Sequence, residues 1–398
     1  MQVIYTIGIL AYGLLIRIAS VFNSKAKKWV NGRQNWKSKL SSFKRTDQNL
    51  YWFHCASLGE FEQGKPIMDA LKAKEECQLV VSFFSPSGYE VRKNYKKADY
   101  VFYLPLDKKS NAKKLIEHLK PTKVFIVKYE FWANLIGALK SNSIPVYLVS
   151  GIFRKNQSFF KWYGDFFINI LRDFETIFVQ DETSQQLLES IKIESIVSGD
   201  TRYDRVMANS NFASKIDLVK KFCQGNRVFV VGSSWIEDDQ IIMPLINSNS
   251  FKVKVIIAPH EILESRLKQI ENQLDKSNIR YSNYKGETDQ EVLIIDNIGM
   301  LMHLYQFAKI AYVGGGFKTG LHNILEPASF GVPVLFGPNH RKFPEAKLFI
   351  ENGIGFEVDS ISKLRGIYNE LLNDDRSTKV LEFMKSQVGA TQIVLQRL

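Results

Sequence analysis

The chain has 398 residues, of which 45% are hydrophobic and 24% charged, and its formal net charge at pH 7 is +12. This length exceeds what one hydrophobic core usually serves, and the composition excludes a fibrous or largely disordered protein. The surplus of positive charge indicates an anionic partner: a phosphorylated substrate, an anionic membrane or nucleic acid.

The first 22 residues form an apolar segment in which Arg17 is the only charged residue. A helix of about 20 residues is long enough to cross a bilayer. Lysines and arginines follow between residues 25 and 39, so the positive-inside rule places the remaining chain in the cytoplasm. We therefore expect residues 1–24 to be a membrane anchor or an interfacial helix on the cytoplasmic leaflet of a membrane. A helix buried in the core is the third alternative.

Short apolar runs alternate with amphipathic stretches from residue 50 to about residue 200, which predicts a parallel sheet built from βαβ units. The expected strands are 50–55, 78–84, 100–104, 123–128, 145–149, 175–179 and 195–198. The expected helices include 61–74, 108–119, 130–140 and 183–191. The polar stretch 199–212 then reads as the approach to a linker.

The alternation restarts after the linker and predicts a second parallel sheet. The expected strands are 227–231, 253–257, 291–295, 309–313, 332–336 and 355–358. The expected helices are 236–246, 261–275, 299–307, 322–330, 343–351 and 360–373. The simplest architecture is therefore α/β, with domains at 45–205 and 213–374 and a helical tail at 375–398. A substrate cleft is expected where two such domains meet.

A glycine-rich run, residues 313–338, is the densest signal for a ligand site. Gly315 and Gly316 would let the backbone approach a ligand, and His322 and Asn323 precede or open a helix whose free N–H groups can hold an anion. Glu326 could accept hydrogen bonds from a ribose diol, although Asn-x-x-Glu is also an ordinary capping box. The run fits a nucleotide-sugar donor. It departs from G-x-G-x-x-G, which disfavours a dinucleotide.

Glu60 lies in the segment FHCASLGEFEQ, residues 53–63, directly after an expected strand. Ligands of open α/β sheets bind at the carboxyl ends of the strands, so a carboxylate there could serve as a general base. An acid in a first helical turn is equally explained by the helix dipole.

Taken together, these motifs make the sequence resemble the 3-deoxy-D-manno-octulosonic acid (Kdo) transferases. The matching segments are HCASLGE (54–60), FFSPSGYE (83–90), YLPLD (103–107), KYEFWANLI (128–136), GDTRYD (199–204), GSSWIEDD (232–239), APHE (258–261), DNIGMLMHLY (296–305) and the 313–338 run. The resemblance implies a GT-B fold of two Rossmann-like domains, with the acceptor in the first and the donor in the second. It also implies an inverting transfer of Kdo from CMP-Kdo to the lipid A precursor lipid IVA.

Site residues follow from the same resemblance. Glu60 matches the catalytic base, and Glu130 matches a glutamate that supports it. The implied donor-binding residues are Pro259, His260, Ile298, Gly299, Met300, Asn323, Ile324, Leu325 and Glu326, with Ser233, Ser234, Gly315, Gly316 and His322 as weaker candidates. The acceptor is expected to meet Ser85, Ser87, Gly88 and Arg92.

The chain departs from the family's pattern at one donor segment. The family often has Pro-Arg-His where this chain has Ala258-Pro259-His260, so an arginine contact must come from elsewhere, with Lys318 or Arg341 as candidates. The alternatives are another GT-B enzyme, a UDP-sugar transferase or epimerase, and a non-catalytic membrane protein that binds anionic lipid.

No cofactor or metal is expected, with CMP-Kdo as a co-substrate. The six histidines lack metal-ligand spacing, and no Asp-x-Asp motif lies near the donor run. Cys55, Cys77 and Cys223 show no paired spacing, which is typical of a reducing compartment. No nucleic-acid motif is evident, so the expected partners are CMP-Kdo, the lipid A precursor and the cytoplasmic leaflet.

Overall fold

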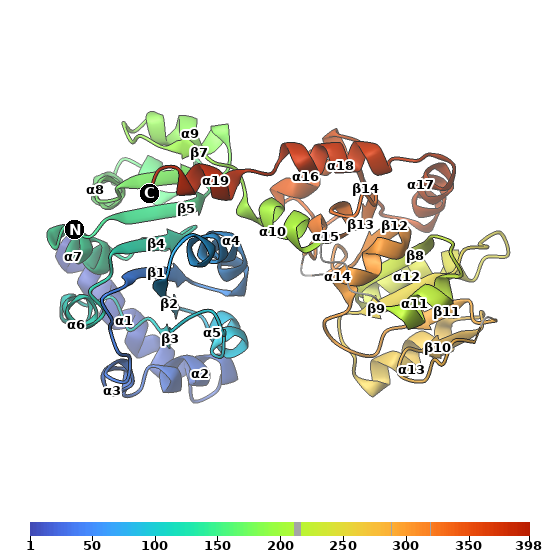
Figure 1. The fold of residues 1–398 in the computed structure, drawn as a ribbon, viewed down its shortest axis with the longest axis horizontal. Helices are drawn as coiled ribbons and strands as arrows, with labels where there is room; N and C mark the ends of the chain where they lie inside the picture. Colours follow the sequence, from blue (N-terminus) through green and yellow to red (C-terminus); the bar gives the residue numbers. More distant parts are fainter. Residues whose placement is uncertain (211–215, 288, 319) are drawn as a thin grey trace. The chain divides into compact units, whose positions relative to one another are not determined.

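The computed structural model describes residues 1–398 except 211–215, 288 and 319. The chain divides into two compact units, Met1–Arg205 with Val388–Leu398 and Val206–Gln387 (Figure 1). The expected start of a second domain at residue 213 lies outside the described residues. The expected tail, 375–398, is divided between the units at residue 388.

Unit 1 is built on a seven-stranded parallel sheet in the order β3-β2-β1-β4-β5-β6-β7. The strands are β1 Asn49–Cys55, β2 Cys77–Phe83, β3 Tyr100–Tyr103, β4 Lys123–Val127, β5 Val146–Gly151, β6 Thr176–Val179 and β7 Ile196–Val197. Both faces of the sheet are buried, which explains why its strands read as continuous apolar runs. Trp52 belongs to the core on one face, and Phe53 to the core on the other.

Helices cover both faces of the first sheet. The core around Trp52 includes side chains of α3 Trp36–Leu40, α6 Lys109–Leu119, α7 Ala133–Ser141, α8 Asp165–Arg172 and α9 Glu182–Glu189. The core around Phe53 includes side chains of α4 Leu58–Lys74, α5 Pro86–Arg92 and α19 Ala390–Leu395. Two further helices, α1 Gln2–Ala19 and α2 Ser24–Gly32, precede the sheet, and α10 Thr201–Ser210 leads out of it.

Unit 2 repeats this architecture with a parallel sheet in the order β10-β11-β9-β8-β12-β13-β14. Its strands are β8 Val228–Ser234, β9 Val255–Pro259, β10 Asn278–Arg280, β11 Val292–Ile294, β12 Ala308–Val313, β13 Val334–Phe336 and β14 Gly355–Glu357. Its helices are α11 Asp217–Cys223, α12 Ile236–Ile246, α13 Glu264–Gln273, α14 Leu301–Leu304, α15 Leu325–Ala328, α16 Pro344–Glu351, α17 Ile361–Asn373 and α18 Ser377–Ser386. The predicted α/β class with two Rossmann-like domains is confirmed.

The boundary between the two units, at Arg205 and Val206, falls inside the stretch 199–212 predicted to approach a linker. Most of this stretch forms helix α10, because its polar residues have partners within unit 1: Thr201 Oγ1 donates to the Gln63 carbonyl, and Arg205 pairs with Glu62. One local prediction is wrong. The helix expected over 322–330 is reduced to α15, since Gly331 with φ +76° ends it soon after it begins.

Helix α1 is the one helix among the described residues that is long and apolar enough to cross a membrane. Gly13 is its only buried residue, so α1 is not the buried core helix of the third alternative. One side of the helix nevertheless rests on unit 1. Tyr5 donates to Asp107 Oδ2 at 2.6 Å, and Gln2 donates to Asn134 Oδ1 at 2.9 Å.

Each sheet has a switch point beside its first strand. The strands that come next in the chain lie on one side of that first strand, and the later strands lie on its other side. In unit 1 this point lies between β1 and β4, and in unit 2 between β8 and β12. Ligands of open α/β sheets bind at the carboxyl ends of the strands beside such a point. The loops after β1, β4, β8 and β12 are therefore where the fold favours a ligand site.

Candidate functional site

Glu60 lies at the switch point of the first sheet. Strand β1 ends at Cys55, and Glu60 occupies the third position of α4, whose N-cap is Ser57. Oε2 of Glu60 accepts hydrogen bonds from the Ser57 N–H at 2.7 Å and from Ser57 Oγ at 3.2 Å. The carboxylate thus completes a capping box, as the helix-end explanation requires.

Capping employs only one oxygen of this carboxylate. No hydrogen bond to Oε1 of Glu60 is found among the described residues, so that oxygen is available to accept a proton. Burial raises the pKa of Glu60 above its ordinary value, and the nearby charge of Glu130 raises it further. Ser57 and Lys128 lower the pKa and partly offset these effects. The geometry therefore fixes a carboxylate whose pKa has moved toward the pH at which a general base works best.

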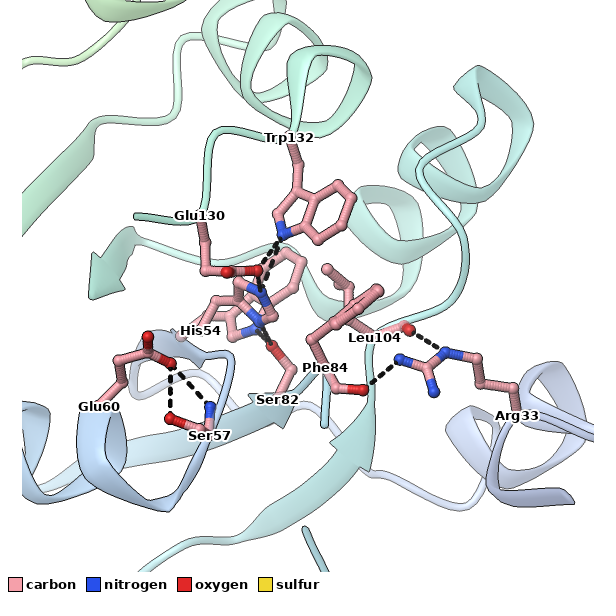
Figure 2. A network of polar contacts seen from close by, with 10 residues as sticks. Arg33, His54, Ser57, Glu60, Ser82, Phe84, Leu104, Glu130 and Trp132 are labelled. Atoms are coloured by element: carbon pink, nitrogen blue, oxygen red, sulfur yellow. Dashed lines mark hydrogen bonds and ion pairs between the residues drawn. The ribbon is translucent and has the colours of Figure 1, made fainter. Parts of the chain in front are cut away.

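Glu130 follows β4, the strand beside β1, and ends a chain of hydrogen bonds (Figure 2). Its Oε2 accepts from Trp132 Nε1 at 2.8 Å and lies 3.3 Å from Nε2 of His54. Nδ1 of His54 lies 2.9 Å from Ser82 Oγ, which also accepts from the buried indole of Trp52. His54 is fully buried, so this chain holds the Glu130 carboxylate in one orientation.

The substitution Glu130→Gln should move the pH dependence of catalysis. Removing the negative charge takes away one of the two effects that raise the pKa of Glu60, so that pKa should fall toward its ordinary value. The acid limb of kcat/KM for sugar transfer should then shift to lower pH. Glutamine can still accept from the Trp132 N–H, which preserves the loop. A pH–rate profile identical to that of the wild type would show that Glu130 does not act on Glu60 electrostatically.

The expected acceptor residues lie around α5, close to Ser57. Ser85 is the N-cap of this helix and accepts from the Ser87 N–H at 3.3 Å. Gly88 is buried, and a Cβ there would come within 2.4 Å of the Phe83 ring and 3.0 Å of the Ser57 carbonyl carbon. Its lack of a side chain thus lets α5 pack against the start of α4. Contact between Gly88 and an acceptor stays a prediction.

Arg92 at the end of α5 is engaged within the protein. It forms an ion pair with Glu62 at 2.6 Å, and Glu62 also pairs with Arg205. Contact between Arg92 and an acceptor stays a prediction.

The carboxyl end of β8 is organised by Asp238. Its Oδ2 accepts from the N–H groups of Trp235 and Gly315 at 2.8 and 3.0 Å, and its Oδ1 accepts from the Tyr312 hydroxyl at 2.7 Å. Asp238 therefore ties the start of α12 to the glycine turn after β12. Ser233, with φ +53°, and Ser234, whose buried Oγ lacks a hydrogen-bond partner among the described residues, lie in this corner.

The glycines after β12 are needed for packing of the protein on itself. A Cβ on Gly315 would lie 2.4 Å from the Gly320 carbonyl oxygen, and one on Gly316 would lie 2.6 Å from the backbone of Gly337. Gly315 also has φ +93°, which favours glycine. Close backbone contacts within unit 2 thus account for both residues without a ligand.

Three stacked rings lie at the carboxyl ends of the second sheet. The ring centroids of Trp235 and His260 are 4.3 Å apart, and those of His260 and His322 are 4.5 Å apart. Trp235 Nε1 donates to His322 Nε2 at 2.9 Å, and Lys318 Nζ lies 4.3 Å from the centre of the Trp235 ring. Burial lowers the pKa of His322 to about 4, so this imidazole is neutral at pH 7.

Lys318 therefore lies near His260, through the Trp235 ring that both contact. His260 ends the segment Ala258-Pro259-His260, in which the arginine that is common in the family is missing. Lys318 also lies 3.4 Å from Glu237, while Arg341 is exposed in the loop after β13.

The remaining donor candidates lie in the loops around this ring stack. Asn323 Nδ2 donates to Glu326 Oε1 at 3.0 Å, and Asn323 Oδ1 accepts from the Leu325 N–H at 3.2 Å. Ile324 and Leu325 are fully buried and contribute packing. Pro259 ends β9, and Ile298, Gly299 and Met300 precede α14, with the Ile298 side chain 88% exposed.

The sequence interpretation missed the aromatic and histidine partners of these candidates. His54, Trp132 and Trp235 are all within quoted motifs, but none was assigned a role. Each lies at, or shortly after, the carboxyl end of a strand beside a switch point, and that placement is a signal that could have identified them.

The part of the chain that the structure describes contains no group of three or more His, Cys, Asp or Glu residues suited to a metal ion. The three cysteines are buried and unpaired. Metal-independent activity stays a prediction.

Residues 34–205 match the family described as 3-Deoxy-D-manno-octulosonic-acid transferase. A protein of that name from Aquifex aeolicus is 29% identical over 340 residues, which are 83% of this chain and 88% of the relative. The Haemophilus influenzae protein of the same name is 26% identical, over 87% of this chain and 86% of its own length. A bifunctional glycosyltransferase/methyltransferase from Fusobacterium nucleatum is 26% identical over 96% of this chain, which spans only 62% of that longer protein.

Solved structures share the fold at low sequence identity. The UDP-GlcNAc 2-epimerase of Neisseria meningitidis superposes with a TM-score of 0.61 and 18% identity, covering 87% of this chain and 98% of that one. MurG of Acinetobacter baumannii gives a TM-score of 0.56 and 11% identity, covering 88% and 98%. These likenesses concern the fold alone, and they support the GT-B class.

Proposed function

Because the chain is related to the Kdo transferases along most of its length, we propose that it transfers Kdo from CMP-Kdo to the lipid A precursor lipid IVA. The observation that carries this proposal is the position of Glu60. A half-buried carboxylate with one uncommitted oxygen stands at the switch point of the first sheet, within the segment that matches the family.

In the proposed reaction, Oε1 of Glu60 accepts the proton of an acceptor sugar hydroxyl. The hydroxyl oxygen forms a bond to the anomeric carbon of Kdo while the bond from that carbon to the CMP phosphate oxygen breaks. CMP leaves with the bonding electron pair, and a single displacement inverts the configuration. One base within hydrogen-bond reach of the hydroxyl is sufficient for such a step.

Unit 2 offers groups suited to a cytidine nucleotide. His260, the exposed member of the stack with Trp235 and His322, can pack on a base, and Lys318 beside the stack can meet a phosphate. Glu326 is oriented by Asn323 and can accept from ribose hydroxyls. We assign donor binding to this corner on these grounds.

Nucleotide binding separates this proposal from a UDP-sugar enzyme. In calorimetry with the full chain, CMP should bind at least about tenfold more tightly than UMP or UDP-N-acetylglucosamine, a difference of ~1.4 kcal/mol. Preferential binding of the uridine nucleotides would instead support the epimerase or UDP-sugar transferase alternative. A chain that binds neither nucleotide would contradict both enzymes and leave the lipid-binding alternative.

We also propose that α1 lies on the cytoplasmic leaflet of the inner membrane. Contacts along its length, from Gln2 and Tyr5 to Gly13, hold one side of the helix on unit 1. The opposite side exposes the apolar side chains of Val3, Ile4, Ile7, Leu10, Leu14, Leu15 and Ile18, and Val21 and Phe22 are exposed just beyond the end of the helix. A helix with one docked and one apolar exposed side is suited to an interface rather than to a span.

A further inference from the structure

A cavity of about 550 Å³ lies between α1, α2, α3 and the start of α6, and its lining includes neither Glu60 nor Glu130. Four cationic side chains line it: Arg17, Arg33, Lys37 and Lys108. None of the residues that line it is acidic. A concave site with several cations and no carboxylate is electrostatically complementary to an anion.

Arg33, one of these four cations, is held by hydrogen bonds to the protein backbone. Its guanidinium donates to three backbone carbonyls, those of Trp29, Phe84 and Leu104, at 2.7–3.1 Å. Figure 2 shows the bonds to Phe84 and Leu104. No ion pair between Arg33 and a carboxylate of the described residues is found. Burial lowers the pKa of Arg33 to about 9, which reflects a charge that carbonyl dipoles and ring faces compensate only in part.

The remaining lining adds to the uncompensated positive potential. Lys37 faces Lys114, and this contact is the chief reason that the pKa of Lys37 is lowered. Helix α6, which follows Lys108, has neither a side-chain cap nor an acidic residue in its first turn. The positive end of its dipole is therefore left to attract an anion.

Trp29 also lines the cavity and is 7% exposed. The guanidinium carbon of Arg33 lies 3.7 Å from the centre of the Trp29 ring, so the indole helps to hold this cation at the wall of the cavity.

The position of Arg17 indicates where the anion comes from. Arg17 belongs to α1, and its neighbours Leu14, Ile18 and Val21 expose 60%, 55% and 75% of their surface. When these side chains enter a bilayer, Arg17 lies at the level of the phosphates. We propose that the cavity binds the phosphate of an anionic membrane phospholipid and thereby sets the orientation of unit 1 on the bilayer. This inference rests on the membrane placement of α1 proposed above, and not on the transfer reaction.

Vesicle binding tests the proposal with two variants that lose the same charge. One is Arg17→Gln/Lys37→Gln/Lys108→Gln, which removes three cations from the cavity. Its control is Lys220→Gln/Lys252→Gln/Lys385→Gln, three exposed lysines of unit 2 for which no ion pair is found among the described residues. Binding to phosphatidylcholine vesicles with and without phosphatidylglycerol is measured by co-sedimentation, after circular dichroism has confirmed that both variants are folded.

The cavity variant should bind phosphatidylglycerol vesicles roughly tenfold or more weakly than the wild type, and the control less than about threefold more weakly. Equal losses in the two variants would overturn the cavity proposal and leave a diffuse charge effect. A wild-type chain that binds no vesicles would instead contradict the placement of α1.

In calorimetry, soluble dihexanoyl phosphatidylglycerol should bind more tightly than inorganic phosphate. Equal affinity would show that the cavity takes free phosphate, which would overturn the assignment to a lipid.

Discussion

The variant Glu60→Gln should lose Kdo transfer by about 10²- to 10⁴-fold in kcat, the range that general base catalysis supplies. The amide cannot accept the hydroxyl proton, whereas its oxygen can still accept from the Ser57 N–H and so preserve the capping box. The melting temperature and the affinity for CMP should therefore stay close to those of the wild type. Initial rates are measured by chromatography of the lipid product.

A matched control is available in the same unit. Glu182 is an exposed acid in the first turn of α9, which follows β6, so Glu182→Gln makes the same chemical change after a strand that does not border the switch point. It should retain full activity. A folded Glu60→Gln protein with wild-type transfer would show that Glu60 is only a helix-capping acid.

The second large effect should be on stability, at the buried ion pair between Arg266 of α13 and Asp239 of α12. Their side chains are 5% and 2% exposed, and Arg266 Nη2 donates to Asp239 Oδ1 at 2.9 Å. Arg266→Met should lower the free energy of unfolding of unit 2 by ~3–5 kcal/mol, because it leaves the Asp239 carboxylate buried and unpaired. Hydrogen exchange of peptides from residues 228–273 across a urea series measures this change.

The same helix offers the control. Lys268 pairs with Glu264 in solvent, with side chains 66% and 60% exposed, so Lys268→Met should cost less than about 1 kcal/mol. The double variant Arg266→Met/Asp239→Leu should recover most of the stability, because no unpaired charge then remains in the core. A single Arg266→Met no more costly than Lys268→Met would refute a structural role for the pair.

Most strands of both sheets could be predicted, because a strand buried on both faces is a continuous apolar run whatever its neighbours are. Elements that depend on partners far along the chain could not be predicted from their own residues. Helix α10 is polar, and its residues are satisfied by Gln63 and Glu62, more than a hundred residues earlier. Strand β10 has only three residues, too few for a period to show.

The residues of the candidate site, too, could be predicted only in part from the sequence. Motif resemblance identified Glu60 and Glu130, but the sequence does not show that β1 and β4 are adjacent, a fact that brings His54 and Trp132 to the Glu130 carboxylate. The stack of Trp235, His260 and His322 likewise joins loops after β8, β9 and β12. The sequence does not show that the backbone of unit 2 packs closely on Gly315 and Gly316, and donor contact at these two residues stays a prediction.

Mass spectrometry of the lipid product tests the central claim most directly. The purified full-length chain is incubated with CMP-Kdo and lipid IVA, and the lipid fraction is analysed. The account predicts a product heavier than lipid IVA by one or more Kdo residues, formed by the wild type and nearly absent with Glu60→Gln. Unchanged lipid IVA after incubation with a folded wild-type chain that binds CMP would contradict it.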